Sequence, residues 1–320
     1  MTHLPLGSGA EFDRIRAIAA RLGQAASALG DDAAVILRGE TNLVASIDCS
    51  VEGVHFRTDW LSFQEIGGRA AAAALSDLAA EGANVIGVLV TIGGPTGGIR
   101  ETEVVPSDPV TEIMAGVGHM VSSVGGKVLG GDLVKSEKYL VDICVLGEAR
   151  RPVTRGGAKP GDGVWVTGSF GGPWAALQAL HRGEKPAPAH RARFAHPLPR
   201  VAAGQWLAEH GATAMIDVSD GLAADLGHVA AASRVGIALI ADVVPRVEGV
   251  SPSDALSSGE EYELAVTLPA GFGAKEVALF ESQVRGKLTR VGDVKDGSAV
   301  TVMLGGRRIP TPSGFDHFAP

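Results

Sequence analysis

The sequence predicts a mixed α/β protein made of two domains. Three observations support this prediction: the chain has 320 residues, 45% of them are hydrophobic, and short apolar runs alternate with helical patterns along its whole length. A chain of this length forms one large domain or two of roughly 150 residues, and its apolar fraction is ample for a core. The polar stretch Glu148–Gly163 marks the boundary, which predicts an N-terminal domain over residues 1–150 and a C-terminal domain over residues 151–320.

The first half contains three helical patterns and five strand patterns. Apolar residues at helical spacing predict a helix over Glu11–Leu22, and a capping box at Ser62 opens an Ala-rich helix that runs to about Glu81. Asp108 followed by Pro109 predicts the start of a third helix, which continues to Val124. The predicted strands are Ala33–Leu37, Asn42–Ile47, Val85–Ile92, Lys127–Leu129 and Tyr139–Leu146.

The second half repeats this alternation. The predicted helices are Trp174–His181, Val201–His210, Leu222–Ala232 and Lys275–Val284. The predicted strands are Val164–Thr167, Ala214–Val218, Ile237–Ala241, Tyr262–Leu268, Leu288–Val294 and Val300–Leu304. Between the first two helices, the Pro-, His- and Arg-rich segment 182–199 suits either a mobile flap or a surface loop.

Composition and charge argue against several classes of protein. The net charge of −8 comes without a Lys/Arg run, which argues against a nucleic-acid partner, whose backbone requires clustered cations. The apolar stretches are shorter than the roughly 18 residues that span a bilayer, and the N-terminus lacks the pattern of a secretory signal. Cys49 and Cys144 have no metal-binding or redox spacing, so a reduced cytoplasmic protein is expected.

Carboxylates gather at predicted strand ends and in Gly-flanked turns. They are Asp31, Asp32, Asp48, Asp77, Asp132, Asp217 and Asp220. Ligands bind at strand ends in α/β sheets, and Mg²⁺ prefers carboxylate and hydroxyl oxygens, so the set suits several Mg²⁺ ions. Taken singly, each Asp is more often a helix cap or a turn residue. Asp77 resists that explanation, because an uncompensated carboxylate inside an Ala/Leu-rich helix is costly.

Three other segments carry candidate contacts with ordinary structural alternatives. Gly168–Gly172 has the form of a phosphate-binding loop between a strand and a helix, although structural Gly turns of this form are commoner. His55 follows the Asp48 segment and is placed to contact an anionic ligand, the alternative being a packed or surface His. Ser258–Leu264 puts three acids around a Tyr, for which a solvated sheet edge is the ordinary explanation.

Taken in order, the segments resemble the thiamine-monophosphate kinase family, which belongs to a superfamily with aminoimidazole ribonucleotide synthetase, selenophosphate synthetase and a hydrogenase maturation protein. The segments that carry the resemblance are Gly30–Val35, Val51–Phe56, Ala74–Ala80, Gly130–Asp132, Ala158–Asp162, Ile216–Gly227, Gly259–Leu264 and Gly314–Phe318. The resemblance implies a two-domain fold like that of aminoimidazole ribonucleotide synthetase. Its N-terminal domain would bind ATP and Mg²⁺ and form a dimer sheet or barrel, and its C-terminal domain would complete the site.

The resemblance also implies the activity and the residues that carry it. A cytoplasmic homodimer would phosphorylate thiamine monophosphate with ATP and several Mg²⁺ ions, as the last step of thiamine diphosphate biosynthesis. The implied Mg²⁺ ligands are Asp32, Ser46, Ile47 through its carbonyl, Asp48, Asp77, Asp132, Asp217 and Asp220. The implied ATP contacts are Gly131, Asp132, Arg155 and Ser219, and the implied thiamine phosphate contacts are His55, Glu260 and Phe315. No general base is expected, because a phosphate monoester with a second pKa of about 6 is already mostly dianionic at neutral pH.

Two alternative functions stay open at this point. One is another ATP-using enzyme of the superfamily. The selenophosphate synthetase type carries an early Cys, whereas no Cys precedes Cys49 here. The hydrogenase maturation type carries a Cys at its C-terminus, whereas this chain ends Phe318-Ala319-Pro320. The other is a non-catalytic nucleotide- or thiamine-phosphate-binding protein. The number of carboxylates argues against it, because binding alone would not require so many ligands for hard cations.

Overall fold

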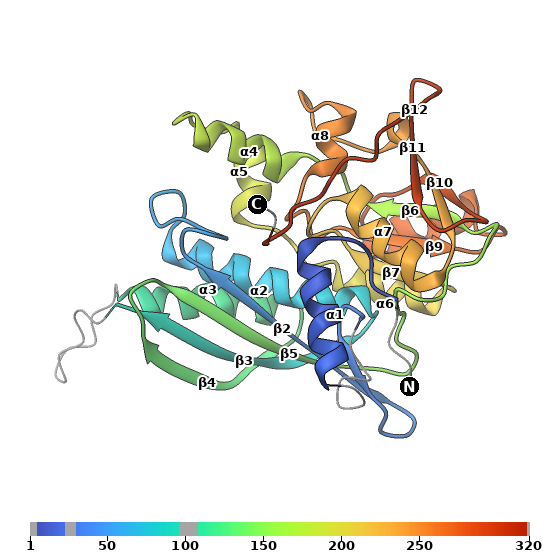
Figure 1. Ribbon diagram of the computed structural model, residues 1–320. Coiled ribbons are helices and arrows are strands. Elements are labelled where there is room, and N and C mark those ends of the chain that lie inside the picture. Colours follow the sequence, from blue (N-terminus) through green and yellow to red (C-terminus); the bar gives the residue numbers. More distant parts are fainter. Residues whose placement is uncertain (1–4, 23–29, 96–107, 319–320) are drawn as a thin grey trace.

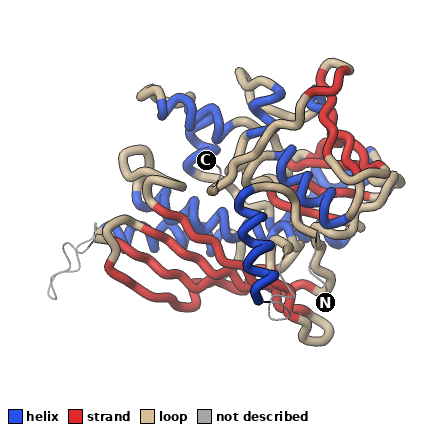
Figure 2. The backbone as a smooth tube through the Cα atoms, in the orientation of Figure 1, coloured by secondary structure: helices blue, strands red, loops and turns tan. Residues whose placement is uncertain are grey.

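In the described part of the chain the strands form two separate sheets, each packed against helices (Figure 1). The computed structural model describes residues 5–22, 30–95 and 108–318. Figure 2 shows the strands gathered in two places along the molecule, with helices against each sheet. This arrangement confirms the predicted mixed α/β fold class. In the described residues no helix is long and apolar enough to cross a membrane.

The first sheet has five strands from the first half of the chain. They are β1 (Ala34–Ile36), β2 (Asn42–Val51), β3 (Asn84–Gly94), β4 (Lys127–Lys135) and β5 (Leu140–Ala149). Their order in the sheet is β1-β2-β5-β3-β4, and neighbours are antiparallel except for the parallel pair β3 and β4. Within one chain's described residues neither this sheet nor the second one closes into a barrel.

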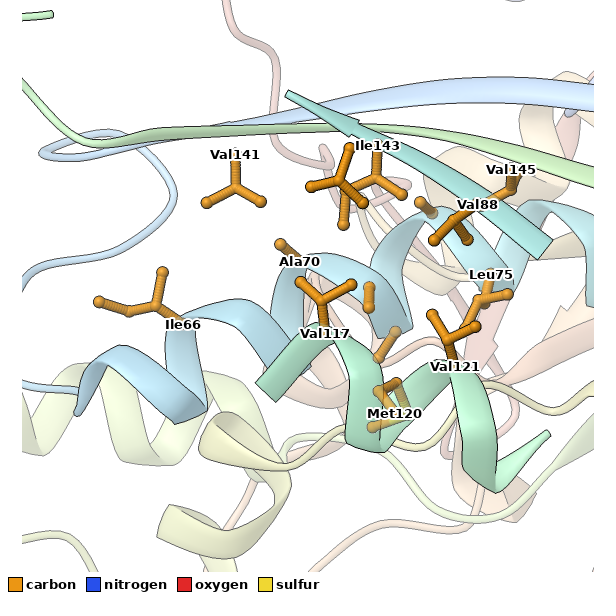
Figure 3. Close-up of a cluster of buried hydrophobic side chains, with 14 of the residues drawn as sticks. Ile66, Ala70, Leu75, Val88, Val117, Met120, Val121, Val141, Ile143 and Val145 are labelled. Carbon is orange, nitrogen blue, oxygen red and sulfur yellow. The ribbon is translucent and has the colours of Figure 1, made fainter. Parts of the chain in front are cut away.

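Helices α2 (Phe63–Ala80) and α3 (Pro109–Ser123) cover one face of the first sheet (Figure 1). Alternate residues of a strand point to the same face, and Val141, Ile143 and Val145 of β5 all point toward the helices. There they meet helix residues such as Ile66 and Val117, as Figure 3 shows. The opposite face of this sheet has no described helix packed across it.

The two helices approach closely because glycine stands where they cross. A Cβ atom at Gly67 would lie 1.9 Å from the carbonyl oxygen of Ile113, and one at Gly116 would lie 2.0 Å from that of Gln64. Both contacts are far shorter than any side chain tolerates. The predicted capping box is present at the start of α2, where the Ser62 hydroxyl accepts from the N–H of Glu65 at 3.3 Å. The start of α2 is therefore fixed by local sequence, and its packing by small residues.

The second sheet has seven strands, in the order β12-β11-β8-β10-β6-β9-β7. They are β6 (Gly163–Thr167), β7 (Ala214–Asp217), β8 (Gly236–Ile240), β9 (Leu264–Leu268), β10 (Leu288–Lys295), β11 (Val300–Leu304) and β12 (Arg307–Ile309). Helices cover both faces: Val164 and Val166 of β6 pack in the core beneath α7 (Leu222–Ser233), and Trp165 packs on the other side with α6 (Val201–Glu209) and α9 (Ala274–Val284). The remaining helices are α1 (Ala10–Leu22), α4 (Gly172–His181), α5 (Pro188–Ala195), the 3₁₀ turn η2 (Ala241–Val243) and α8 (Pro252–Ser257).

Helix α2 also links the two halves of the molecule. A Cβ atom at Gly204 of α6 would lie 1.9 Å from the carbonyl oxygen of Ala79, so α6 packs directly on the last turn of α2. This contact brings the C-terminal end of α2 beside the second sheet. A side chain on that end of α2 can therefore meet residues from both sheets.

The structure differs from the predicted elements in several places. Helices α5 and α8 and strand β12 were not predicted, and α5 shows that segment 182–199 is more than a loop. Strand β2 runs on to Val51, so the expectation that Asp48 follows the strand is wrong: Asp48 pairs with Ile143 inside the sheet. Strand β4 similarly runs through Gly131 and Asp132. Both strands continue because backbone pairing in a sheet accepts polar residues as well as apolar ones. The end of an apolar run therefore does not mark the end of a strand.

Candidate functional site

A cleft of about 970 Å³ is lined by residues from both halves of the chain. It receives side chains from α1, β2, α2 and the turns that follow β7 and α8, together with the C-terminal segment. Twelve of the predicted site residues line it. They are Asp32, Ser46, Ile47, Asp48, His55, Asp77, Arg155, Asp217, Ser219, Asp220, Glu260 and Phe315.

An acidic centre lies where the two halves meet. Asp32 precedes β1, Asp77 lies in the last turn of α2, and Asp217 ends β7. One carboxylate oxygen of each lies within 4.8 Å of the other two. Burial raises the pKa of Asp217 to about 7, and the neighbouring charge of Asp32 adds to it. Burial likewise raises the pKa of Asp77 well above its usual value, with the charges of Asp217 and Asp32 as the next causes. The centre therefore concentrates buried negative charge.

Strand β2 adds further oxygens to this centre. Ser46 and Asp48 are two residues apart and lie on the face of β2 that looks toward α2, whereas Ile47 lies on the opposite face. The Ser46 hydroxyl donates to Oδ2 of Asp77 at 2.6 Å. Burial raises the pKa of Asp48 to about 6, and the charge of Asp142 raises it further. The two β2 side chains thus converge with Asp77 on one region of the cleft.

Arg155 is the permanent cation of the acidic centre. Its guanidinium donates to both carboxylate oxygens of Asp32, from Nη2 at 2.6 Å and from Nε at 3.1 Å. Its backbone N–H donates to Oδ1 of Asp31 at 3.0 Å. Burial raises the pKa of Asp31 to about 6, and the adjacent Asp32 adds to the effect. The bidentate pair fixes Asp32 and leaves the other carboxylates of the centre without a comparable partner.

The turn after β7 carries Ser219 and Asp220 and is held by the side chain of Asp225. The Oδ2 atom of this buried carboxylate accepts from the N–H groups of Asp220, at 3.2 Å, and Gly221, at 3.0 Å. Burial raises the pKa of Asp220 to about 6. The backbone carbonyl of Asp220 accepts from the N–H of Phe315 at 3.0 Å. This turn therefore joins the acidic centre to the C-terminal segment.

The three residues predicted to contact the thiamine phosphate lie close together at another part of the cleft. The ring of His55 lies 5.0 Å from that of His317, which in turn lies 4.8 Å from the exposed ring of Phe315. Burial lowers the pKa of His55, the charge of His317 lowers it further, and Glu260 opposes both. The Glu260 carboxylate also forms an ion pair with Arg69 of α2. Three segments distant in sequence thus supply one patch of aromatic, basic and acidic groups.

The turn that carries Glu260 has an unusual backbone. Glu260 and Tyr262 have φ angles of +57° and +51°, a backbone region that residues other than glycine rarely adopt. The N–H of Glu260 donates to the carbonyl of Ser219 at 2.6 Å, and that of Tyr262 donates to the carbonyl of Val218 at 2.9 Å. These bonds tie the turn to the one that follows β7 and aim Glu260 at the cleft.

The acidic segment 258–264 is not a solvated edge, contrary to the ordinary explanation of its charges. Glu261 and Glu263 are buried and pair with Arg193, at 3.0 and 3.1 Å, and Glu263 also pairs with Arg200 at 2.5 Å. A cluster of like charges in a sequence suggests solvent exposure, but oppositely charged side chains from elsewhere in the chain can pair with the cluster and allow it to be buried. Here the partners come from α5 and from the start of α6, which local sequence reasoning did not connect to this strand.

The Gly168–Gly172 turn does not offer a phosphate cradle. The N–H of Gly168 donates to the carbonyl of Lys287 at 3.1 Å, that of Phe170 donates to the carbonyl of Pro245 at 2.9 Å, and that of Gly171 donates to the Glu261 carboxylate. These donors are already satisfied within the protein, so the structural alternative for this Gly-rich turn is the correct one.

Gly131 and Asp132 lie apart from the other predicted site residues. Both are exposed on the edge strand β4 and are outside the lining of the cleft. Asp132 pairs with Thr91, whose neighbours in the same row across the sheet are Asp142 and Cys49. A Cβ atom at Gly131 would lie 1.8 Å from the carbonyl oxygen of Val90, so the close pairing of β3 and β4 by itself requires glycine there.

Comparison with known proteins identifies the family. The chain matches the AIR synthase related protein family, with its N-terminal domain at residues 30–149 and its C-terminal domain at residues 159–305. It is 33% identical to a thiamine-monophosphate kinase of Mycobacterium tuberculosis over 90% of this chain and 85% of the relative, and 34% identical to one of Halobacterium salinarum over 94% and 99%. The chain belongs to the thiamine-monophosphate kinase family.

Solved structures agree with this membership of the thiamine-monophosphate kinase family. AaThiL complexed with AMPPCP and TMP superimposes with a TM-score of 0.83 at 29% identity, covering 97% of each chain. The thiamine-monophosphate kinase of Stenotrophomonas maltophilia K279a has a TM-score of 0.76 at 29% identity, covering 96% of this chain and 99% of the other. The hydrogenase maturation protein HypE in complex with ATP, at 20% identity and a TM-score of 0.67, shares the fold.

The acidic centre of this family member fits Mg²⁺ by its own chemistry. Its donors are carboxylates and one serine hydroxyl, the hard oxygen ligands that Mg²⁺ prefers. The raised pKa values of Asp77 and Asp217 arise first from burial and then from the like charges that face each other. A divalent cation would remove that repulsion, and among the described residues Asp77 has a serine hydroxyl as hydrogen-bond partner and no ion pair.

Sequence reasoning missed four residues that shape this site of the kinase family member. They are Arg69, Asp225, Tyr262 and His317. A signal for one of them was present: Arg69, Ala73 and Asp77 are four residues apart along α2, so all three lie on one side of the helix and all line the cleft. The argument that drew attention to Asp77, a charge inside an Ala-rich helix, applies equally to Arg69.

Proposed function

We propose that this protein transfers the terminal phosphoryl group of ATP to thiamine monophosphate and so forms thiamine diphosphate and ADP. The observation that carries the proposal is the convergence on one cleft of the acidic centre with Arg155 and the patch around His55 and Phe315. The N-terminal domain, residues 1–150, would supply most of the acidic centre, and the C-terminal domain, residues 151–320, would complete it. The unpaired Cys49 and Cys144 suit the cytoplasm as its compartment.

The chemistry of this transfer asks mainly for charge neutralisation and alignment. The acceptor phosphate is mostly dianionic at neutral pH, since its second pKa is about 6, so a general base is unnecessary. Two anions must approach in line, which requires fixed orientation. Bound Mg²⁺ would supply positive charge that offsets the negative charge of the phosphates. The residues that would hold it in this chain are Asp32, Ser46, Ile47 through its carbonyl, Asp48, Asp77, Asp217 and Asp220.

Arg155 and Ser219 are proposed to contact the phosphates of ATP. Arg155 keeps its charge at any working pH because Asp32 raises its pKa, although burial acts in the opposite direction. Its planar fork is already oriented by the bidentate pair with Asp32. The direct test of the whole proposal is ADP formation from ATP and Mg²⁺, with and without thiamine monophosphate. ADP that does not depend on thiamine monophosphate would favour another enzyme of the superfamily, and its absence in all conditions would favour a binding protein.

The substrate contacts make a separable prediction about the two Michaelis constants. Replacing His55 or Phe315 by Ala is expected to raise KM for thiamine monophosphate by about tenfold, because each removes a ring from the patch, while KM for ATP changes little. Steady-state kinetics with each substrate varied in turn checks this. Phe318→Ala is the matched control, because Phe318 is exposed in the same segment and is outside the lining of the cleft. Equal increases in both constants would remove the assignment.

We propose that a second copy covers the open face of the first sheet and makes a homodimer. Ile47 of β2 and Leu89 of β3 lie in one row on this open face, and they are 65% and 41% exposed. Exposed apolar surface of this kind on a sheet face is typical of a protein interface. Asp132 pairs with Thr91, which is two residues after Leu89 on β3, so Asp132 lies on this same face. We propose that Gly131 and Asp132 bind ATP and Mg²⁺ only when the second copy is present.

The expected result for this interface is a dimeric mass for the wild-type protein by light scattering at micromolar concentration. Leu89→Arg should yield a monomer, because the new charge would be buried against the partner. Leu198→Arg, at an exposed position away from this sheet, should leave the dimer intact. A monomeric wild-type protein would refute the proposed interface.

A further inference from the structure

Arg69 is a buried cation in the wall of the cleft, and its hydrogen-bonding capacity is only partly used. Its side chain is 5% exposed, and Nη1 donates to the carbonyl oxygen of Phe194. Its guanidinium carbon lies 4.4 Å from the centroid of the Phe194 ring. Nη2 forms an ion pair with the Glu260 carboxylate. A guanidinium has five N–H donors, so one carbonyl and one partly exposed carboxylate leave Arg69 with donors for a further anion.

The other arginines that line the cleft are better satisfied. Arg155 has both carboxylate oxygens of Asp32, and Arg57 has both oxygens of Asp59, at 2.9 and 2.7 Å. The pair of Arg69 with Glu260 is weaker than these bidentate pairs, because it has a single contact and the Glu260 side chain is 30% exposed. A partly hydrated carboxylate is the partner that an incoming anion can replace most easily. Arg69 is therefore the arginine of the cleft wall that is most available to an anionic ligand.

Arg69 and Asp77 of the acidic centre line the cleft from the same side of α2, about two helical turns apart. Burial raises the pKa of Tyr262 well above its usual value. The charges of Glu260, Asp48 and Asp217 raise it further, while Arg69 lowers it. One hydroxyl therefore senses Arg69 together with two carboxylates of the centre. Arg69 also acts on His55, whose lowered pKa it lowers further after the larger effects of burial and His317. Arg69 thus shares the cleft wall with the acidic centre, and its ion pair with Glu260 joins it to the aromatic patch.

We propose that Arg69 binds the phosphate group of the acceptor, so that the site selects a phosphate ester over the corresponding free alcohol. This inference rests on the proposed function and adds a residue that recognises the acceptor's anion. A planar guanidinium matches phosphate oxygens with paired donors, which a lysine ammonium does not. Glu260 keeps the guanidinium oriented when the acceptor is absent.

The experiment compares the binding of thiamine monophosphate and thiamine, which differ only in the phosphate. Arg69→Met should weaken binding of thiamine monophosphate by about 10- to 100-fold, the usual effect of losing a charged hydrogen bond. Its effect on thiamine should stay within about threefold. Dissociation constants from calorimetry, and from competition against turnover for thiamine, give the ratio for each protein. Arg57→Met is the matched control, since it makes the same chemical change at an exposed arginine of the same cleft and should leave the ratio unchanged.

Equal weakening of both ligands in Arg69→Met would overturn the proposal, because it would mean that Arg69 acts only by holding Glu260. Wild-type protein that binds thiamine as tightly as thiamine monophosphate would overturn it too. If Arg69→Met does not fold, Arg69→Lys decides: it keeps the charge and loses the fork, so the ratio should fall by about threefold or more. An unchanged ratio in that variant is again contrary to the proposal. Wild-type ADP formation with thiamine monophosphate tests the proposed function separately, so the two failures are distinguishable.

Discussion

Replacing Asp217 by Asn is expected to abolish turnover while leaving the fold intact. Asp217 ends β7 with 4% of its surface exposed, and its carboxylate oxygen lies within 4.8 Å of those of Asp32 and Asp77. The amide keeps the shape of the side chain and removes the negative charge that would hold Mg²⁺ against the phosphates. Losing one group of a preorganised charged site costs about 100- to 1,000-fold in rate. We expect kcat for ADP formation to fall by at least that factor.

The same substitution should raise thermal stability when Mg²⁺ is absent. Burial and the neighbouring Asp32 raise the pKa of Asp217 to about 7, so the charged form is disfavoured in the folded protein. A neutral amide removes this cost. Asp162→Asn is the matched control: Asp162 is also buried, but it lies away from the cleft and accepts from Thr213 at 2.7 Å. That variant should lose stability and keep its activity. Near-normal turnover of Asp217→Asn at limiting Mg²⁺ would show that Asp217 is not a metal ligand.

The elements with strong local signals could be predicted from the sequence. The capping box at Ser62, the Asp108-Pro109 start of α3 and the periodicity of α1 each fix a helix through neighbours a few residues away, and all three helices are present. The position of Asp48 was wrong because its strand continues through polar residues. Helix α5 was missed because its sequence, PAHRARFA, lacks an apolar stripe, and its Phe194 packs against the distant α2.

The site could be predicted in part, and the residues that were missed are mainly the long-range partners of the predicted ones. Residues on recognisable motifs, such as Asp32, His55 and Phe315, line the cleft. The partners that satisfy them come from elsewhere in the chain: Arg69 reaches Glu260 across 191 positions of sequence, the difference between their residue numbers. Ion pairs of this separation leave no periodic trace in a sequence. A sequence therefore indicates which residues carry the chemistry sooner than it indicates what holds them in place.

The stability of the metal-free protein is expected to fall as pH rises from about 5 to about 8, and Mg²⁺ is expected to reverse most of that fall. Burial raises the pKa values of Asp31, Asp48 and Asp220 to about 6 and that of Asp217 to about 7. In the unfolded chain an Asp has a pKa of about 3.9. Between about pH 4 and about pH 7 the folded protein therefore binds more protons than the unfolded chain, so its free energy of unfolding decreases as pH rises.

Two imidazoles, those of His55 and His228, act in the opposite direction but do not change the sign, because burial lowers the pKa of each. Burial lowers the pKa of His228 to about 3, so its contribution to stability is lost as pH falls below about 6.5. Five carboxyl groups of the cleft act against these two imidazoles, because the pKa of Asp77 is raised as well. Thermal melts in metal-free buffer should show Tm lower by roughly 5 °C or more at the upper end of the range. The difference should shrink on adding Mg²⁺, because a cation that binds only the folded state adds stability by mass action.

Asp217→Asn is the variant that makes this pH test specific to the acidic centre. It removes a cleft carboxyl with a pKa of about 7, so its melting temperature should depend less on pH above about 6, and its response to Mg²⁺ should be weaker. A wild-type melting temperature that rises between about pH 5 and about pH 8 in metal-free buffer would contradict the whole account. It would mean that the carboxylates are not crowded in the folded state, and that nothing in the cleft of the protein calls for a divalent cation.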